Sequence, residues 1–176
     1  MATSAVKSNL ALLSVLALVS IPSALANAPA TEEALARSAL VGMQLSVRKA
    51  AAQGKMPDTM VACVERLSAD SFIPIFRSLL EQNLSAAELA TAEKFSQSEV
   101  GRKFAKAGIA QAYVAFGEQP PEPVTDVSES EYREVEQFSQ TAAGQKLWSQ
   151  KIIESPAARS AVTAKIGELL DSCRPK

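Results

Sequence analysis

A segment of 23 residues occurs twice in this chain, at positions 84–106 and 127–149. The two copies are 43 residues apart and share eight identical pairs: Ser85/Ser128, Glu88/Glu131, Glu93/Glu136, Phe95/Phe138, Ser96/Ser139, Gln97/Gln140, Gly101/Gly144 and Lys103/Lys146. Repeats of this kind fold as copies of one supersecondary unit. Any fold of this chain must therefore contain the unit twice.

Each copy begins with the signature of a helix N-terminus. Ser85 with Glu88, and Ser128 with Glu131, have the spacing of a capping box. Apolar residues at N′ and N4 complete a hydrophobic staple in both copies: Leu84 with Leu89, and Val127 with Tyr132. An apolar stripe follows, ending at Phe95 or Phe138. Both copies are predicted to start a helix in the same way.

A second helix is predicted to begin after a sharp corner in each copy. The corner residues are Phe95, Ser98 and Gly101 in the first copy, and Phe138, Thr141 and Gly144 in the second. Ser and Thr are good N-caps, and a glycine inside a helix is unfavourable, so its repeated use predicts a close crossing by another backbone. The small residues Ala105, Gly108 and Ala112 extend that surface. Lys103 and Lys146 are expected to face water.

The glycine with neighbouring lysines also raises the alternative of an anion site at the second helix N-terminus. A Walker loop requires a strand, two spaced glycines and a Gly-Lys-Ser/Thr triplet, and none is present. The structural corner is the favoured interpretation.

The remaining sequence favours helices throughout. Helices are predicted after Thr31 as N-cap, near Pro57 and Asp58, from Asp70 or Ser71 with Pro74 in the first turn, and after Ser155-Pro156. A proline-rich connector, residues 117–127, separates the copies. We expect an all-α single domain, a bundle of about seven or eight helices containing two helical hairpins.

The N-terminus has the pattern of a secretory signal peptide. Lys7 precedes an apolar block from Leu10 to Ile21, followed by Pro22 and the small-residue site Ala24-Leu25-Ala26. Cleavage after Ala26 would leave residues 27–176 as a periplasmic domain. Retention as an anchor is the alternative, but a spanning helix needs about 20 apolar residues, and this block is shorter. No transmembrane segment is expected after cleavage.

Two cysteines, Cys63 and Cys173, suggest one disulfide in an exported protein. The alternative is two unrelated buried thiols. Neither cysteine belongs to a Cys-x-x-Cys pair, so a redox-catalytic role is disfavoured.

The sequence offers little for catalysis. It contains no histidine, which removes Ser-His-Asp and Cys-His catalysis and most transition-metal sites; no catalytic, cofactor-binding or metal-binding residue is predicted. A formal net charge of −1 argues against nucleic-acid binding. Glu88, Glu93, Glu131 and Glu136 remain conceivable acid/base groups, but we expect structural or solvated roles. Trp148 is expected in the core, with a binding platform as the alternative.

The repeated motif resembles a bacterial family of exported helical proteins, the domain of unknown function 2059 family. The resemblance rests on FSQSEVGRKF and FSQTAAGQKL and covers roughly residues 67–151. An aromatic pair associated with the family is reduced here to Phe95-Ser96 and Phe138-Ser139. The resemblance implies an α-helical periplasmic domain and supplies no catalytic residues.

Two hypotheses for the function follow. The preferred one is a non-catalytic binding or envelope-accessory protein that holds a protein, peptide or apolar small molecule in grooves between helices. Homo-oligomers are compatible with it. The alternative is a carboxylate-dependent hydrolase acting on envelope polymers.

Overall fold

The computed structural model describes residues 28–123 and 127–174, so the predicted signal peptide lies outside the described residues. Every regular element in these ranges is helical, which confirms the predicted all-α class. The eight α-helices are α1 (Ala30–Ala52), α2 (Asp58–Val64), α3 (Ile73–Asn83), α4 (Ala86–Gln97), α5 (Glu99–Phe116), α6 (Glu129–Gln140), α7 (Ala142–Gly144) and α8 (Pro156–Ser172). Short 3₁₀ turns cover Ala69–Phe72 and Ile152–Glu154, and a π turn covers Gln145–Ser149.

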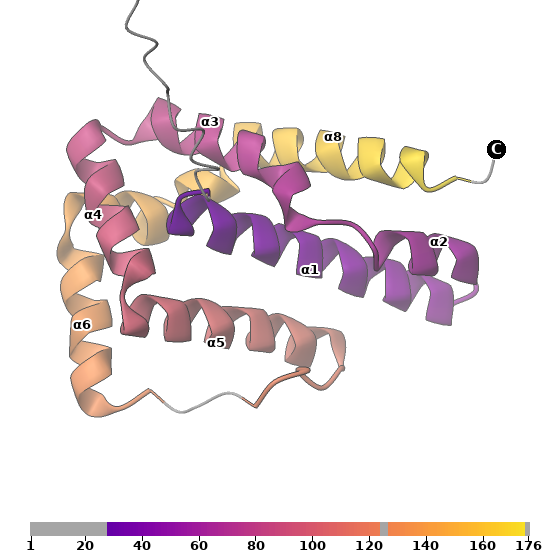
Figure 1. Ribbon diagram of the computed structural model, residues 1–176, viewed down its shortest axis with the longest axis horizontal. Helices are drawn as coiled ribbons and strands as arrows, with labels where there is room; N and C mark the ends of the chain where they lie inside the picture. The colour runs from indigo at the N-terminus through magenta and orange to yellow at the C-terminus, as the bar shows by residue number, and fades with distance from the viewer. Residues whose placement is uncertain (1–27, 124–126, 175–176) are drawn as a thin grey trace, which may run out of the picture.

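Helix α1 runs through the middle of the molecule, with α5 along one side and α3 and α8 along the other (Figure 1). Helices α1, α5 and α8 all run in the same direction, from left to right in that view. Helices α4 and α6 stand across one end of this layer, and they belong to the two repeat copies.

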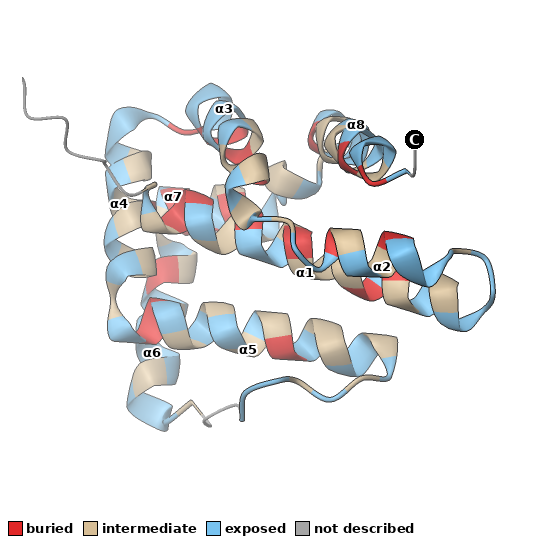
Figure 2. Cartoon of the chain, turned by 45° about the vertical axis from the view of Figure 1, so that its right-hand side comes forward, coloured by how far each residue is buried: buried red, intermediate tan, exposed pale blue. Residues whose placement is uncertain are grey.

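Two clusters of buried residues make the core. The larger one joins α1, α2, α3 and α8 around Phe72 and Val64, neither of which is exposed to solvent. The smaller one lies between the repeat copies and contains Leu80, Leu84, Ala92, Phe138, Ala143 and Leu147. Figure 2 shows fewer buried residues along α5 and α6 than along α1.

The predicted cysteine pair lies at the end of the larger cluster. Cys63 and Cys173 are joined with an Sγ–Sγ distance of 2.00 Å and a Cα–Cα distance of 5.6 Å, across 110 residues. The bond ties α8 to α2, far from the repeat copies. In the loop-entropy model, closing a loop of this size contributes about 4–5 kcal/mol to stability.

The N-terminus of α1 differs from the prediction. Thr31 is not the N-cap: the helix begins at Ala30, and Pro29 precedes it without a side-chain cap. Glu93 of α4 supplies the cap instead, because its carboxylate accepts from the amides of Ala30 (2.8 Å) and Thr31 (3.0 Å) and from Thr31 Oγ1 (3.1 Å). A carboxylate at a helix N-terminus also interacts favourably with the helix dipole. Glu93, which was expected to be structural or solvated, therefore caps a helix that is distant in the sequence.

Both corners form where the repeat predicts them. Ser98 ends α4 and caps α5, accepting from Gly101 N at 2.9 Å, and Thr141 does the same for Gly144 at 3.0 Å. A Cβ on Gly101 would lie 1.9 Å from Phe95 O. At Gly144 the distance to Phe138 O would be 2.0 Å. The close backbone is therefore the end of the preceding helix, and not a separate crossing helix.

The prediction that another backbone crosses closely over the small-residue stripe is also wrong at Gly108. A Cβ on Gly108 would meet no heavy atom within 4 Å, so nothing crosses closely there.

The second copy ends sooner than the first. Helix α5 continues to Phe116, whereas α7 passes into the π turn and stops before Lys151, which adopts φ 51°. Trp148 in this turn occupies the repeat position of Ala105.

We predict that Gly101→Ala destabilises the fold by about 3 kcal/mol, because the new methyl overlaps a backbone carbonyl that cannot rotate away. Gly42→Ala in α1 is the matched control, since its Cβ would meet nothing within 4 Å. That change should stabilise by about 0.8–1 kcal/mol through helix propensity. Urea unfolding of both variants checks this, and equal midpoints would contradict the account of the corner.

Candidate functional site: paired corners and an apolar trough

The two corners pack directly against each other. The rings of Phe95 and Phe138 are stacked, with centroids 4.1 Å apart and planes 6° from parallel. Trp148 meets both edge-on, at 5.6 Å from Phe95 and 4.8 Å from Phe138, and it also contacts Phe104 at 5.1 Å. Aromatic pairs of this kind add about 0.5–1.5 kcal/mol beyond burial of their area.

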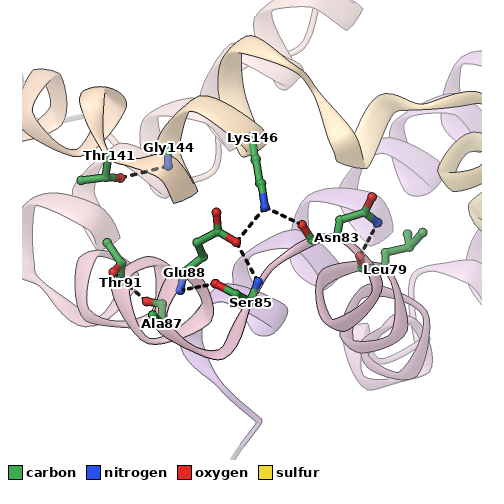
Figure 3. Close-up of polar contacts among 9 residues, drawn as sticks. All are labelled: Leu79, Asn83, Ser85, Ala87, Glu88, Thr91, Thr141, Gly144 and Lys146. Atoms are coloured by element: carbon green, nitrogen blue, oxygen red, sulfur yellow. Dashed lines mark hydrogen bonds and ion pairs between the residues drawn. The ribbon is translucent and has the colours of Figure 1, made fainter.

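The lysine of each copy forms an ion pair with the capping glutamate of the other. Lys103 Nζ lies 2.8 Å from Glu131, and Lys146 Nζ lies 2.8 Å from Glu88. Figure 3 shows Lys146 between Glu88 and the carbonyl of Asn83, which accepts from it at 3.1 Å. The expectation that both lysines face water is therefore wrong: each is partly buried and links the copies.

These contacts lower the pKa of two carboxyl groups. The hydrogen bond from Lys146, followed by that from the Ser85 amide, lowers the pKa of Glu88 to about 2. Lys103 and the Ser128 amide lower the pKa of Glu131 to about 2. A general acid at neutral pH needs a raised pKa, so both groups are suited to capping and ion pairing.

The amides of the two repeated glycines are not free for an anion. The amides of Gly101 and Gly144 donate to Ser98 and Thr141, and both glycines are buried. Lys103 and Lys146 are already paired. The structural interpretation of the repeated glycine holds, and the anion-site alternative has no support here.

An open apolar depression lies over α1, between α5 and α8. We call it the α1 trough. Its floor consists of α1 residues: Leu35, Ser38, Ala39, Gly42, Met43 and Ser46. It comprises three adjoining hollows of about 210, 250 and 440 Å³. The first two share Leu35, Ser38 and Ile153, and the last two share Ala39, so the three hollows adjoin one another along α1.

The walls come from both flanking helices. Helix α5 provides Phe104, Ala105, Gly108 and Phe116, and α8 provides Val162, Ile166 and Leu170. The stacked corners close the end near the start of α1, where Phe95, Phe138 and Trp148 line the trough. Trp148 packs in the aromatic cluster, and it also lines the trough.

The floor is less polar than its sequence suggests. The hydroxyls of Ser38 and Ser46 donate to the carbonyls of Ala34 and Gly42, at 2.9 and 2.7 Å. Because these hydroxyls are already bonded within the helix, they present little unsatisfied polarity to an occupant. Phe104 is 40% exposed at the wall.

The structure brings the six corner residues together, but the cysteines lie elsewhere. Phe95 and Phe138 border the trough, while Ser98, Gly101, Thr141 and Gly144 form the corners behind it. Sequence reasoning missed the trough floor. Its signal was the spacing of four between Ala34, Ser38, Gly42 and Ser46, which places four small residues on one helix face.

Within residues 28–123 and 127–174, no helix has the length and apolarity that a membrane crossing requires. In the same ranges, no three side chains of His, Cys, Asp or Glu are grouped so as to hold a metal ion.

The two glutamates predict a pH dependence of stability. Because their pKa values are lower in the folded than in the unfolded chain, they stabilise the fold above about pH 4.5, and this contribution is lost as the pH falls toward about 2. We predict that the urea midpoint falls over this range, and that Lys146→Met makes the fall smaller, since Glu88 then loses its main partner. An identical pH profile in the variant would contradict the pairing.

Comparisons with known proteins find one relationship. Neither the curated proteins nor the solved structures contain a match to the chain. Residues 70–112 match a family described as "Uncharacterized protein conserved in bacteria (DUF2059)". This segment includes the first repeat copy and ends before the second. The resemblance drawn from the repeated motif is thus confirmed: over residues 70–112 the chain matches the domain of unknown function 2059 family.

Proposed function

We propose that the protein is an exported, non-catalytic binding or envelope-accessory protein, and that the α1 trough is its binding surface. The trough itself is the observation that carries the proposal. It is concave and predominantly apolar, as ligand-binding sites usually are. Helices α1, α5 and α8 supply its floor and walls, and the stacked corners close one end.

Side-chain chemistry in the trough supports binding over catalysis. Its floor is free of charged groups, and the hydroxyls of Ser38 and Ser46 are bonded to their own helix. Burial of such a surface by an apolar occupant is favourable by roughly 25 cal/mol per Å² of apolar area. The trough therefore offers hydrophobic contact with little desolvation cost.

The exported location rests on two features. The first is the signal-peptide pattern of residues 1–26, and the second is the bonded pair Cys63–Cys173, which suits an oxidising compartment. Proteolytic maturation after Ala26 would give a protein whose first residue is Asn27, which N-terminal sequencing of the exported protein checks.

No observation favours the carboxylate-dependent hydrolase over the binding protein. Glu88 and Glu131 are held by lysines and helix amides, and Glu93 caps α1. Glu136 is exposed on α6. These acids have structural partners or face solvent, and the trough is lined by other residues.

The proposal is tested with an uncharged naphthalene dye and the emission of Trp148, the single tryptophan of the chain. We predict that the dye binds the full protein and quenches this emission by energy transfer. Gly108→Leu should raise the dissociation constant at least about tenfold, a loss of about 1.4 kcal/mol. The leucine fills open space in the trough beside Trp148.

Gly167→Leu in α8 is the matched control, because this glycine also has open space around it but does not line the trough. It should leave dye binding unchanged. Equal dye affinity in all three proteins, or none in the wild type, would contradict the trough as the binding surface.

A further inference from the structure

We propose that the occupant of the α1 trough is an amphipathic α-helix of a partner protein, lying antiparallel to α1 with an acidic first turn beside Lys49. This inference rests on the proposed function and specifies the partner for the same site. Three independent features of the trough support it: its shape, the direction of its helices and the charges beside it.

The shape of the trough fits a helix. From Leu35 to Ser46 the floor is about 16 Å long, which equals about three turns of helix. Small residues at Ser38, Gly42 and Ser46 allow a helix axis to approach closely, as small residues do at tight helix crossings. In a two-fold symmetric dimer a second copy would present its own concave trough, and two concave surfaces do not fill each other.

The direction of the surrounding helices favours an antiparallel occupant. Helices α1, α5 and α8 run the same way, so their negative C-terminal ends lie together at one end of the trough (Figure 1). A fourth helix running the opposite way places its positive N-terminus at that end. A parallel helix would add a fourth negative end to the same place.

Two cations beside the trough form no ion pair within the described ranges. Lys49 lies near the end of α1, with its Nζ 5.5 Å from the ring centre of Phe116, a wall residue. Arg159, on the first turns of α8, lines the hollow over Leu35, Ser38 and Ala39, in the half of the trough toward the start of α1. Glu154 lines the same hollow, and its carboxylate is 3.6 Å from Lys151. The ten ion pairs of the described residues include neither Lys49 nor Arg159.

These cations complement the charges of an antiparallel helix. Acidic residues are favoured in the first turn of a helix, and in this orientation they meet Lys49. The C-terminal carbonyls of the occupant, which carry partial negative charge, meet Arg159. The central part of the trough meets only the apolar face.

An acyl chain fits these features less well. The trough consists of three shallow, adjoining hollows and not one deep tunnel. A single anionic headgroup would use one of the two cations and leave the other without a partner.

The test uses two helix-stapled peptides of about 14 residues, three to four turns, with the same Leu/Ala face and an uncharged last turn. The first has two glutamates in its first turn, and the second has two lysines at these positions. Titration into the full protein should give at least tenfold tighter binding of the first peptide. Lys49→Glu should reverse this order of affinities, which a merely structural role of Lys49 would not do.

Gly42→Leu should weaken the first peptide at least tenfold, and Gly167→Leu should leave its affinity unchanged; circular dichroism confirms that each variant is folded. Dye binding that depends on Gly108 but is accompanied by no peptide binding would overturn this inference and leave the proposed function standing. A monoacyl lysophospholipid below its micellar concentration that binds the trough more tightly than both peptides would also overturn it. Equal affinity of the protein for the two peptides would overturn the inference as well.

Discussion

The contact between Phe95 and Phe138 is the constraint on which the rest of the structure depends. Each ring lies in the last turn of the first helix of its repeat copy, three residues before the corner residue Ser98 or Thr141. Stacking the rings at 4.1 Å brings the two corners together, and each lysine then reaches the capping glutamate of the other copy. The two hairpins are therefore joined by one apolar contact and two equivalent ion pairs.

This pairing also positions α1 and hence the trough. Helix α4, held by its capping box and by Lys146, presents Glu93 to the first amides of α1. The first corner sends α5 alongside α1, where Arg48 bonds Glu118 just beyond the end of α5. The disulfide secures α8 from the opposite end of the molecule. The two walls and the floor of the trough are thus fixed by separate contacts.

Local sequence signals were sufficient for much of this fold. Capping boxes, N-cap residues and prolines act within a few residues, so they located the starts of α4, α5, α6 and α8. They also placed Pro74 in the first turn of α3, but this helix begins at Ile73, after a 3₁₀ turn, and not at Asp70 or Ser71. Glu93 and Lys146 were misjudged because their partners are more than 50 residues away, and a single sequence contains no record of such pairs. Thr31 was a good local N-cap candidate, but a carboxylate from another helix took that role. The trough could not be predicted, since it depends on how three distant helices are arranged.

The central claim is that the two corners form one cooperative unit, and native-state hydrogen exchange of the Gly101 and Gly144 amides tests it most directly. Both amides donate to a corner hydroxyl and are buried, so exchange requires the corner to open. The account predicts the same opening free energy for both amides, within about 0.5 kcal/mol, and an equal decrease of both in Lys146→Met. A much lower opening free energy at Gly144 than at Gly101 would show that the second copy opens alone. This result would contradict the claim of one cooperative unit.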